Sequence, residues 1–162
     1  SGIKAEERTT MQSADLLRFI RCFSKAYDGV LKRICSERGL SLLEVKVISF
    51  LHNNPEMNTA GDIAEYRLLS KGNVSRAVDS LIRQGYLRRV PDTADRRRVY
   101  LYLLPSSAPV TDRIDREWSA FDAKLFCGFG EEEKQQYDRF KELLMQNAET
   151  IMEEALAEGD GK

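Results

Sequence analysis

The sequence predicts a mainly α-helical protein that carries one small β-hairpin. Apolar residues recur at three- and four-residue steps over most of the 162-residue chain, as they do along one face of an α-helix. Between residues 86 and 104 this pattern gives way to two short runs rich in aliphatic and aromatic residues, separated by a polar, turn-forming segment. We therefore expect helices on both sides of a single hairpin.

The composition is typical of a soluble globular protein, with 42% hydrophobic residues, 31% charged residues and a net charge of -1. The length suits one domain, or one domain with helical extensions. Because no apolar run reaches the roughly 18 residues of a membrane span and no signal peptide is recognisable, we expect a cytoplasmic protein without a membrane partner. The three cysteines show no CxxC spacing, so reduced thiols are expected.

The first predicted helix covers residues 11–37 and ends before Gly39. Its apolar stripe consists of Leu16, Ile20, Phe23, Tyr27, Val30 and Ile34. The apolar surface is widened beyond this stripe by Leu17, Phe19, Cys22, Leu31 and Cys35. A helix with one broad side exposed to solvent does not need these additional apolar residues. We therefore expect a second packing partner, such as another subunit.

Two shorter helices are expected next. Ser41 and Glu44 have the spacing of a capping box, which opens a helix over residues 42–52. Either Asn58 or Thr59 then caps a third, short helix.

A fourth helix is predicted from Ser70 to about Gln84, with Gly85 as its stop. At 100° per residue its apolar side chains gather on one side: Val74, Ala77, Val78, Leu81 and Ile82. The first half of the outward face holds small or hydrogen-bonding residues: Lys71, Gly72, Asn73, Ser75 and Arg76. A helix that enters the major groove of DNA needs such a face, although an ordinary amphipathic helix would show a polar face as well.

Positive charge is concentrated in residues 70–98. Eight basic residues lie there: Lys71, Arg76, Arg83, Arg88, Arg89, Arg96, Arg97 and Arg98. Only three acidic residues accompany them: Asp79, Asp92 and Asp95. A local surplus of positive charge in a mildly acidic protein indicates a surface that attracts polyanions, of which nucleic acid is the commonest.

The predicted hairpin pairs residues 86–90 with residues 99–104 and carries arginines at its tip. An extended basic tip can enter the minor groove of DNA. We expect Arg97 to insert there and Asp95 to hold its guanidinium in place. Arg96 and Arg98 are expected to contact phosphates or the body of the domain.

Helical periodicity returns after residue 107. One helix has Ile114, Trp118, Phe121 and Leu125 on a shared face, and Gly128 and Gly130 interrupt the pattern. The acidic run at residues 131–133 then opens a last helix, at the end of the helix dipole that favours negative charge. Its apolar stripe is Tyr137, Phe140, Leu144, Ala148 and Ile151.

The succession of these segments resembles the MarR (multiple antibiotic resistance regulator) family of winged helix-turn-helix repressors. The segments that carry the resemblance are Asp62–Ala64, Leu69–Leu81, Gly85–Arg89 and Asp95–Arg97. It implies a winged helix-turn-helix domain over residues 41–105, with residues 11–40 and 106–158 forming a helical dimerisation region. One departure is that the second strand ends in Leu-Pro-Ser where the family usually has Leu-Thr, so Ser106 or Ser107 is expected to cap the next helix.

The resemblance also implies a function. Such proteins bind pseudo-palindromic operators in double-stranded DNA as homodimers, usually repress transcription, and release DNA when a small aromatic or phenolic ligand binds. The residues expected to contact DNA are Ser70, Lys71, Gly72, Asn73, Ser75, Arg76, Asp95, Arg96, Arg97 and Arg98. The residues expected to line a ligand pocket are Phe23, Tyr27, Trp118 and Phe121, although aromatic side chains at helical spacing also suit an ordinary core.

Two alternatives remain open at this point. Cys22, which precedes Phe23 in the first helix, invites comparison with a branch of the family that senses peroxides through a thiol. A winged helix can also serve protein contacts instead of DNA. An enzyme is not expected, because His52 is the only histidine and the sequence has no Gly-rich phosphate loop and no nucleophile elbow. We expect no catalytic residue, no metal site and no cofactor.

Overall fold

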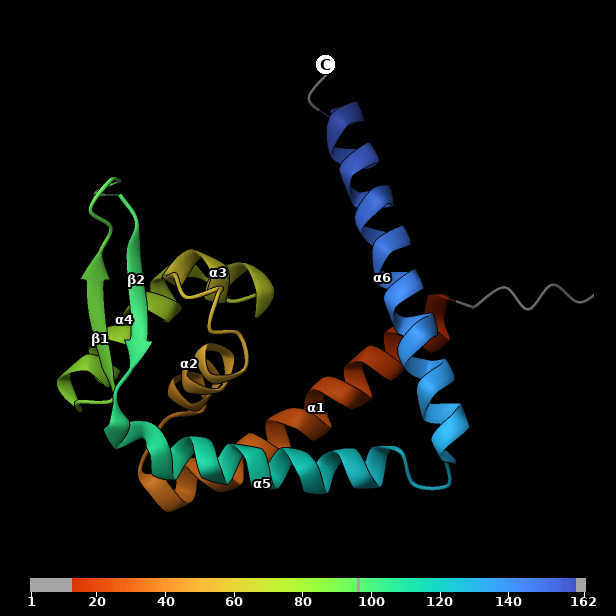
Figure 1. The fold of residues 1–162 in the computed structure, drawn as a ribbon, viewed down its shortest axis with the longest axis horizontal. Helices are drawn as coiled ribbons and strands as arrows, with labels where there is room; N and C mark the ends of the chain where they lie inside the picture. The colour runs from red at the N-terminus through yellow and green to blue at the C-terminus, as the bar shows by residue number, and fades with distance from the viewer. Residues whose placement is uncertain (1–12, 96, 160–162) are drawn as a thin grey trace, which may run out of the picture. The chain divides into compact units, whose positions relative to one another are not determined.

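The computed structural model describes residues 13–95 and 97–159 and confirms the predicted helical fold with one hairpin (Figure 1). The elements are α1 (Ser13–Arg38), α2 (Leu42–Asn53), α3 (Ala60–Tyr66), α4 (Lys71–Arg83), β1 (Leu87–Pro91), β2 (Val99–Leu103), a 3-10 turn (Pro105–Ser107), α5 (Ala108–Leu125) and α6 (Glu131–Gly159). The chain packs as two compact units, residues up to Phe121 and residues from Asp122 on.

Side-chain caps fix where the short helices begin. The Ser41 hydroxyl accepts from the Glu44 N–H at 3.2 Å, while the Glu44 carboxylate accepts from the Ser41 N–H at 2.7 Å, which confirms the predicted capping box. Thr59 and Asp62 form the same reciprocal pair at 3.1 and 3.0 Å. Of the two candidates for the cap of α3, Thr59 is therefore the one that the structure uses.

The start of α4 and the ends of two helices also follow the prediction. The Ser70 hydroxyl accepts from the Asn73 N–H at 3.3 Å and caps α4. Gly39 and Gly85 follow α1 and α4 with φ angles of 66° and 78°. Both angles lie in the left-handed region that glycine adopts without strain, which explains why these helices stop there.

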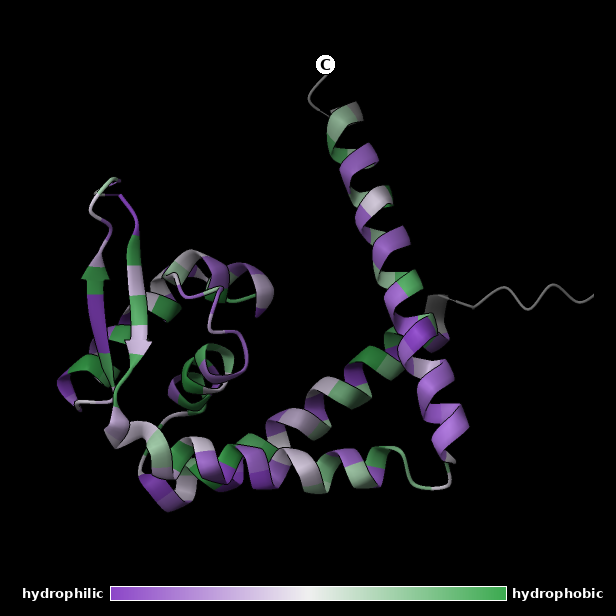
Figure 2. Ribbon diagram, in the orientation of Figure 1, coloured by the Kyte–Doolittle hydropathy of each residue, from purple (hydrophilic) through white to green (hydrophobic). Residues whose placement is uncertain are grey.

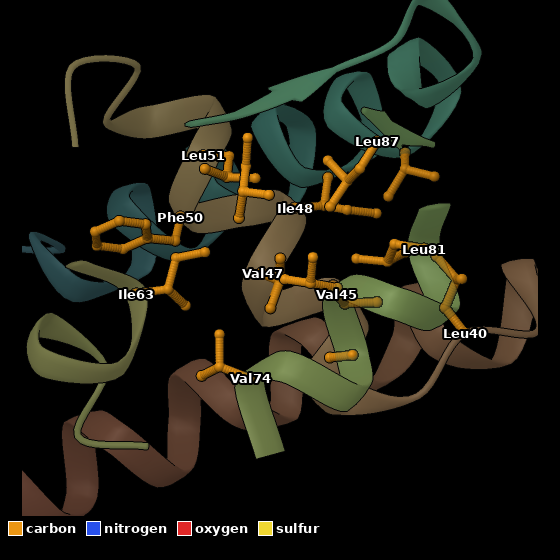
Figure 3. Close-up of a cluster of buried hydrophobic side chains, with 14 of the residues drawn as sticks. Leu40, Val45, Val47, Ile48, Phe50, Leu51, Ile63, Val74, Leu81 and Leu87 are labelled. Carbon is orange, nitrogen blue, oxygen red and sulfur yellow. The ribbon is translucent and has the colours of Figure 1, made fainter. Parts of the chain in front are cut away.

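Helix α2 is at the centre of the hydrophobic core of the first unit (Figure 3). It buries Val45, Val47, Ile48, Phe50 and Leu51. Side chains from other elements converge on it, including Ile63 of α3, Val74 and Leu81 of α4, and Leu87 of β1. Figure 2 shows α2 as a largely hydrophobic segment, in contrast to the mixed surface of α6. Burial of α2 therefore holds α3, α4 and the hairpin in one body.

The hairpin is antiparallel, with Leu87 opposite Leu103 and Pro91 opposite Val99. A short bridge extends it, because the Leu101 N–H donates to the Asn58 carbonyl at 2.7 Å just before α3 begins. The hairpin is thus bonded through the backbone to the segment that leads into α3, in addition to its contacts in the core.

The connection from β2 to α5 differs from the prediction. A 3-10 turn over residues 105–107 leads directly into α5, and the Ser106 and Ser107 hydroxyls donate to the carbonyls of Gly85 and Leu104. The expectation that one of these serines caps α5 is wrong, since the turn that begins at Pro105 places both hydroxyls beside carbonyls. Ser106 instead links the exit of β2 to the end of α4.

The second unit contains the loop after α5 and the long helix α6. The Gly130 N–H donates to the Glu133 carboxylate at 2.7 Å, and the Phe126 ring packs against the Phe129 and Tyr137 rings with centroids 5.6 and 5.0 Å apart. The interruption that Gly128 and Gly130 predict is thus present, with Gly128 at a φ of 89°. Within residues 13–95 and 97–159, no helix has a stretch long and apolar enough to span a bilayer.

The central position of α2 predicts the result of truncating Ile48, which is fully buried. Ile48→Ala should destabilise the protein by about 2–5 kcal/mol, because it removes apolar contacts and leaves a cavity. Urea unfolding at fixed protein concentration measures the change. Leu68→Ala is the control, since Leu68 is 93% exposed and its truncation should change stability by no more than about 0.5 kcal/mol. Equal midpoints for the two variants would contradict this account of the core.

Candidate nucleic-acid interface

The predicted DNA-contacting residues of α4 lie opposite its buried side. Val74, Ala77, Val78 and Leu81 are buried, whereas Ser70, Lys71, Gly72, Ser75 and Arg76 are exposed and Asn73 is half-buried. A Cβ added at Gly72 would meet no atom of this chain within 4 Å. The fold itself therefore does not require a glycine there, and the open space leaves room for a close approach by another molecule.

Asn73 and Arg76 are joined on this exposed surface. The Arg76 guanidinium donates to the side-chain oxygen of Asn73, one helical turn away. Asparagine matches the edge of adenine and arginine the edge of guanine by paired hydrogen bonds. The first turns of α4 thus present both groups side by side.

Polar contacts fix the rotation of α4 about its axis. The Gln84 amide donates to the Glu44 carboxylate of α2 at 2.8 Å, and Arg89 of β1 pairs with Asp79 at 2.5 Å. Burial of Glu44 opposes its ionisation, but hydrogen bonds from Ser80, Ser41 and Gln84 outweigh that effect and lower its pKa. Glu44 is therefore a charged anchor between α2 and α4.

Asp92 organises the turn between the two strands. Its carboxylate accepts from the Ala94 N–H at 2.7 Å, from the Asp95 N–H at 3.1 Å and from the Tyr100 hydroxyl at 2.8 Å. The N–H groups of Asp95 and Ala94, and then the Tyr100 hydroxyl, lower the pKa of Asp92, while the same bond raises the pKa of Tyr100. The ionised carboxylate thus holds the tip of the hairpin in shape.

The role predicted for Asp95 needs a correction. Its carboxylate accepts from the backbone N–H of Arg97 at 3.0 Å, and its carbonyl accepts from the Arg98 N–H at 2.9 Å. Asp95 therefore shapes the backbone of the tip and does not hold the Arg97 guanidinium. In a turn, an aspartate carboxylate is close enough to accept from the backbone N–H two residues further along the chain. Arg96 lies outside the described residues.

Two arginines of the hairpin lie against tyrosine rings of β2. Arg97 and Arg98 are exposed, and the Arg98 guanidinium lies 5.9 Å from the centre of the Tyr100 ring, so it contacts the hairpin itself. Arg88 lies 5.1 Å from the Tyr102 ring in the same way. Figure 2 shows a hydrophilic band in the middle of β1, where Arg88 and Arg89 occur in the sequence.

Little of this positive charge is neutralised within the chain. Among the described basic residues of α4 and the hairpin, only Arg89 has a carboxylate partner within 4 Å. The exposed ones without such a partner are Lys71, Arg76, Arg83, Arg88, Arg97 and Arg98. The surface predicted from the sequence is therefore available to an external polyanion.

The predicted ligand-pocket residues come together between α1 and α5. Trp118 lies 5.3 Å from both Tyr27 and Phe121, and Phe23 lies 5.6 Å from Phe121, measured between ring centres. A pocket of about 370 Å³ is lined by Phe23, Tyr27, Asn53, Arg67 and Trp118. Phe121 is not among the lining residues and packs against Trp118. The volume is at the lower end of the range typical of small-molecule sites.

Arg67 is a pocket residue that the sequence analysis missed. Its Nη2 donates to the Tyr27 hydroxyl at 3.1 Å and to the Ser49 hydroxyl at 3.3 Å. Its guanidinium lies 5.2 Å from the centre of the Tyr27 ring. Nothing in the local pattern indicated this position, because an arginine in a tight connection between helices is usually solvated.

A cluster of ion pairs fixes α5 against α1 beside the pocket. The buried Glu117 accepts from Arg33 Nε at 3.0 Å and pairs with Arg113 at 2.8 Å. Arg113 also pairs with Glu37 at 2.9 Å, and that hydrogen bond lowers the pKa of Glu37. The wall that carries Trp118 is thus held by charged contacts as well as by aromatic packing.

The three cysteines form no disulfide bond with one another. Cys22, Cys35 and Cys127 are all free, and Cys22 and Cys127 are exposed. Burial raises the pKa of Cys35, which is the direction opposite to that of an activated thiolate. Over residues 13–95 and 97–159, no group of three or more His, Cys, Asp and Glu side chains could hold a metal ion.

Comparison with known proteins agrees with the geometry. A model of the MarR family matches residues 38–98. The HTH-type transcriptional regulator YkoM of Bacillus subtilis strain 168 is 28% identical over 123 residues, covering 74% of this chain and 79% of YkoM. The HTH-type transcriptional regulator YcgE of the same strain is 33% identical over 118 residues, covering 73% of each protein.

The fold is similar to that in the crystal structure of the S. aureus MepR–DNA complex. The TM-score is 0.62 at 17% identity, and the match covers 80% of this chain and 94% of the MepR chain. At this level of identity the likeness concerns the fold.

The contacts of Asp92 predict a pH dependence of the hairpin tip. Because the folded state lowers the pKa of Asp92, its stabilising effect is complete above the ordinary aspartate value of about 3.9 and is lost as the pH falls through the lower folded value. The amide resonances of Ala94 and Asp95 should therefore stay constant from neutral pH to about pH 4 and shift only below it. A pH titration by NMR measures this.

Tyr100→Phe is the matched variant for this titration. It removes one donor to the carboxylate, so the midpoint should move towards the ordinary value. A midpoint at or above about 3.9 in the unaltered protein would show that Asp92 does not organise the tip as an ionised group.

Proposed function

Since the chain belongs to the MarR family, whose members are transcriptional regulators and not enzymes, we propose that it represses transcription by binding a pseudo-palindromic operator as a homodimer. The observation that carries this proposal is the exposed surface of α4, which holds small and hydrogen-bonding side chains, together with the exposed hairpin arginines Arg88, Arg97 and Arg98, which have no carboxylate partner among the described residues. The S. aureus protein that shares this fold was crystallised with DNA, which supports duplex DNA as the partner.

In this proposal α4 enters the major groove with its first turns. Gly72 and Ser75 allow the backbone to come close, while Asn73 and Arg76 reach base edges and Lys71 reaches a phosphate. The backbone N–H groups at the start of the helix and its dipole also favour a phosphate near Ser70.

The hairpin is proposed to contact the adjacent minor groove. Arg97 is exposed at the tip and is the residue we expect to insert, while Arg96 and Arg98 contact phosphates. The turn held by Asp92 and Asp95 would keep the arginines extended, so less conformational entropy is lost when DNA binds.

Dimerisation is proposed to involve residues 11–40 and 106–158, with residues 41–105 as the DNA-binding domain. Large apolar side chains at the start of α1 are exposed in the single chain: Leu16, Leu17, Phe19 and Ile20. The stripe of α6 is exposed as well, with Leu144 at 62% and Ile151 at 65%. Contiguous exposed apolar surface of this kind is typical of an interface between subunits.

An aromatic small molecule is proposed as the effector that releases DNA. The pocket lined by Phe23, Tyr27 and Trp118 supports this proposal. Arg67, which lines the pocket, is also the C-cap residue of α3, directly after Tyr66. A ligand in this pocket would thus contact the part of the chain that leads into α4.

We expect Arg97→Ala to weaken operator binding by about 1–3 kcal/mol, because it removes the guanidinium proposed to enter the minor groove. The operator would be selected from a library of random duplexes and its affinity measured by fluorescence anisotropy. The selected sequences should show two half-sites about 10 base pairs apart, or a multiple of that distance. Arg116→Ala, which removes an exposed arginine of α5, is the control and should bind normally.

The same assay at several salt concentrations separates DNA from a protein partner. The logarithm of the affinity should fall linearly with the logarithm of the salt concentration, with a slope of about -0.9 per phosphate contact. Absence of selected duplexes, or affinity that salt does not change, would favour the reading in which the winged helix serves protein contacts.

Phe140→Glu combined with Leu144→Glu should convert the dimer into monomers. Both side chains lie on the exposed stripe of α6, and two buried carboxylates without partners would oppose association. Light scattering measures the mass, and operator affinity should fall with it. Gln146→Glu adds a carboxylate to the opposite side of the same helix and should leave a dimer. A dimer that survives the double substitution would place the interface elsewhere.

A further inference from the structure

Asn73 and Arg76 form a hydrogen-bonded pair on the side of α4 that faces away from the core. The Arg76 guanidinium donates to the side-chain oxygen of Asn73, and it makes no other hydrogen bond within residues 13–95 and 97–159. The backbone of Asn73 is itself fixed, because its N–H donates to the Ser70 hydroxyl at 3.3 Å. Arg76 is thus oriented by a residue that the N-cap of α4 holds in place.

The partner of Arg76 is uncharged. Asp79 lies one helical turn beyond Arg76, at a spacing where a carboxylate can pair with an arginine. The Asp79 carboxylate instead pairs with Arg89 of β1 at 2.5 Å. The contact with Asn73 therefore orients Arg76 and leaves its positive charge uncompensated, so that this charge strengthens a hydrogen bond to an external acceptor.

The pairing restricts what Asn73 can do at a base. Asparagine recognises adenine when its oxygen accepts from the N6 amine and its own amine donates to N7. In this chain the Asn73 oxygen accepts from Arg76. Arg76 is not restricted in the same way, because a guanidinium has five N–H donors and two parallel ones suffice for O6 and N7 of guanine.

We infer that Asn73 is a positioning residue, which orients Arg76 toward a guanine in the major groove and does not itself specify an adenine. An arginine that rotates freely loses rotamer entropy when it binds, and one that a neighbour already holds loses less. This inference rests on the proposed function and narrows it. Of the two side chains proposed to reach base edges, Arg76 specifies the base and Asn73 acts through Arg76.

Selection of operators from random duplexes tests this division of roles. The unaltered chain should require a guanine at one position of each half-site, with affinity about tenfold or more above that for adenine, and Arg76→Ala should tolerate any base there. Asn73→Ala should still prefer guanine, but the preference should fall several-fold. An adenine whose selection is lost in Asn73→Ala, or a guanine preference that this variant leaves unchanged, would overturn the inference.

Asn73→Asp separates the orientation of Arg76 from its charge. The carboxylate keeps an acceptor oxygen at this position, so the preference for guanine should be retained. It also compensates the charge of Arg76 and repels phosphates, so the affinity for every duplex should fall. A guanine preference as weak as that of Asn73→Ala would contradict the positioning role.

Base analogues test whether Arg76 contacts the guanine in the major groove. Inosine keeps O6 and N7 of guanine and lacks only the minor-groove amine, whereas 7-deazaguanine lacks N7. In fluorescence anisotropy, a duplex with inosine at the selected guanine should bind like the original, and one with 7-deazaguanine should bind about tenfold more weakly. In Arg76→Ala the two analogues should bind equally. A loss with 7-deazaguanine that persists in Arg76→Ala would overturn the assignment of Arg76.

Arg83→Ala is the matched control. Arg83 is exposed in the last turn of α4, so its removal should leave the guanine preference unchanged, and circular dichroism establishes that each variant is folded. If no duplex is selected, the regulator proposal fails and this inference fails with it. If operators are selected but their guanine does not depend on Arg76, the inference alone fails and the regulator proposal stands.

Discussion

The structure of the first unit depends on the burial of α2. Helix α4 packs its side of Val74, Ala77, Val78 and Leu81 into the core around α2, and this contact decides which residues of α4 remain outside. The outward surface is therefore a consequence of the core: Lys71, Gly72, Ser75 and Arg76 are exposed because their neighbours in the helix are buried. A change of rotation that exposed Val74 or Leu81 would lose apolar burial worth about 1.5–3 kcal/mol for each side chain.

Hydrophobic packing alone leaves some freedom of rotation, and directional contacts remove it. The Glu44 carboxylate accepts hydrogen bonds from two helices. The Ser41 N–H donates to it at the start of α2, and the Gln84 amide donates to it at the end of α4. The hairpin is tied to α4 by Arg89 and Asp79, and to the segment before α3 by the bond from Leu101 to Asn58. The elements proposed to enter the two grooves thus form one rigid body, which is the condition for reading both grooves in a fixed register.

Features that depend on local spacing were predictable from the sequence, and features that depend on distant partners were not. The caps at Ser41 and Ser70 follow from hydrogen bonds across three residues, and the faces of α4 follow from helical periodicity. The pairing of Asp95 was wrongly predicted, because a side chain near a turn has both backbone and side-chain donors within reach and the spacing does not distinguish them. Arg67 was missed because its partners Tyr27 and Ser49 lie 40 and 18 residues away.

The surplus of apolar residues on the first helix divides into two parts in the structure. Val30, Leu31 and Ile34 are buried by the core of the first unit, whereas Leu17 is 66% and Phe19 is 56% exposed. The C-terminal half of α1 is thus anchored in the core of the first unit, while its N-terminal half carries an exposed apolar surface. If a second copy of the chain covers that surface, the distance between the two α4 helices is set through α1, because the same helix contacts both the core and the interface. The pocket lined by Phe23 and Tyr27 lies between the exposed and the buried parts of α1, so the proposed effector would lie where the DNA-binding part joins the proposed dimer interface.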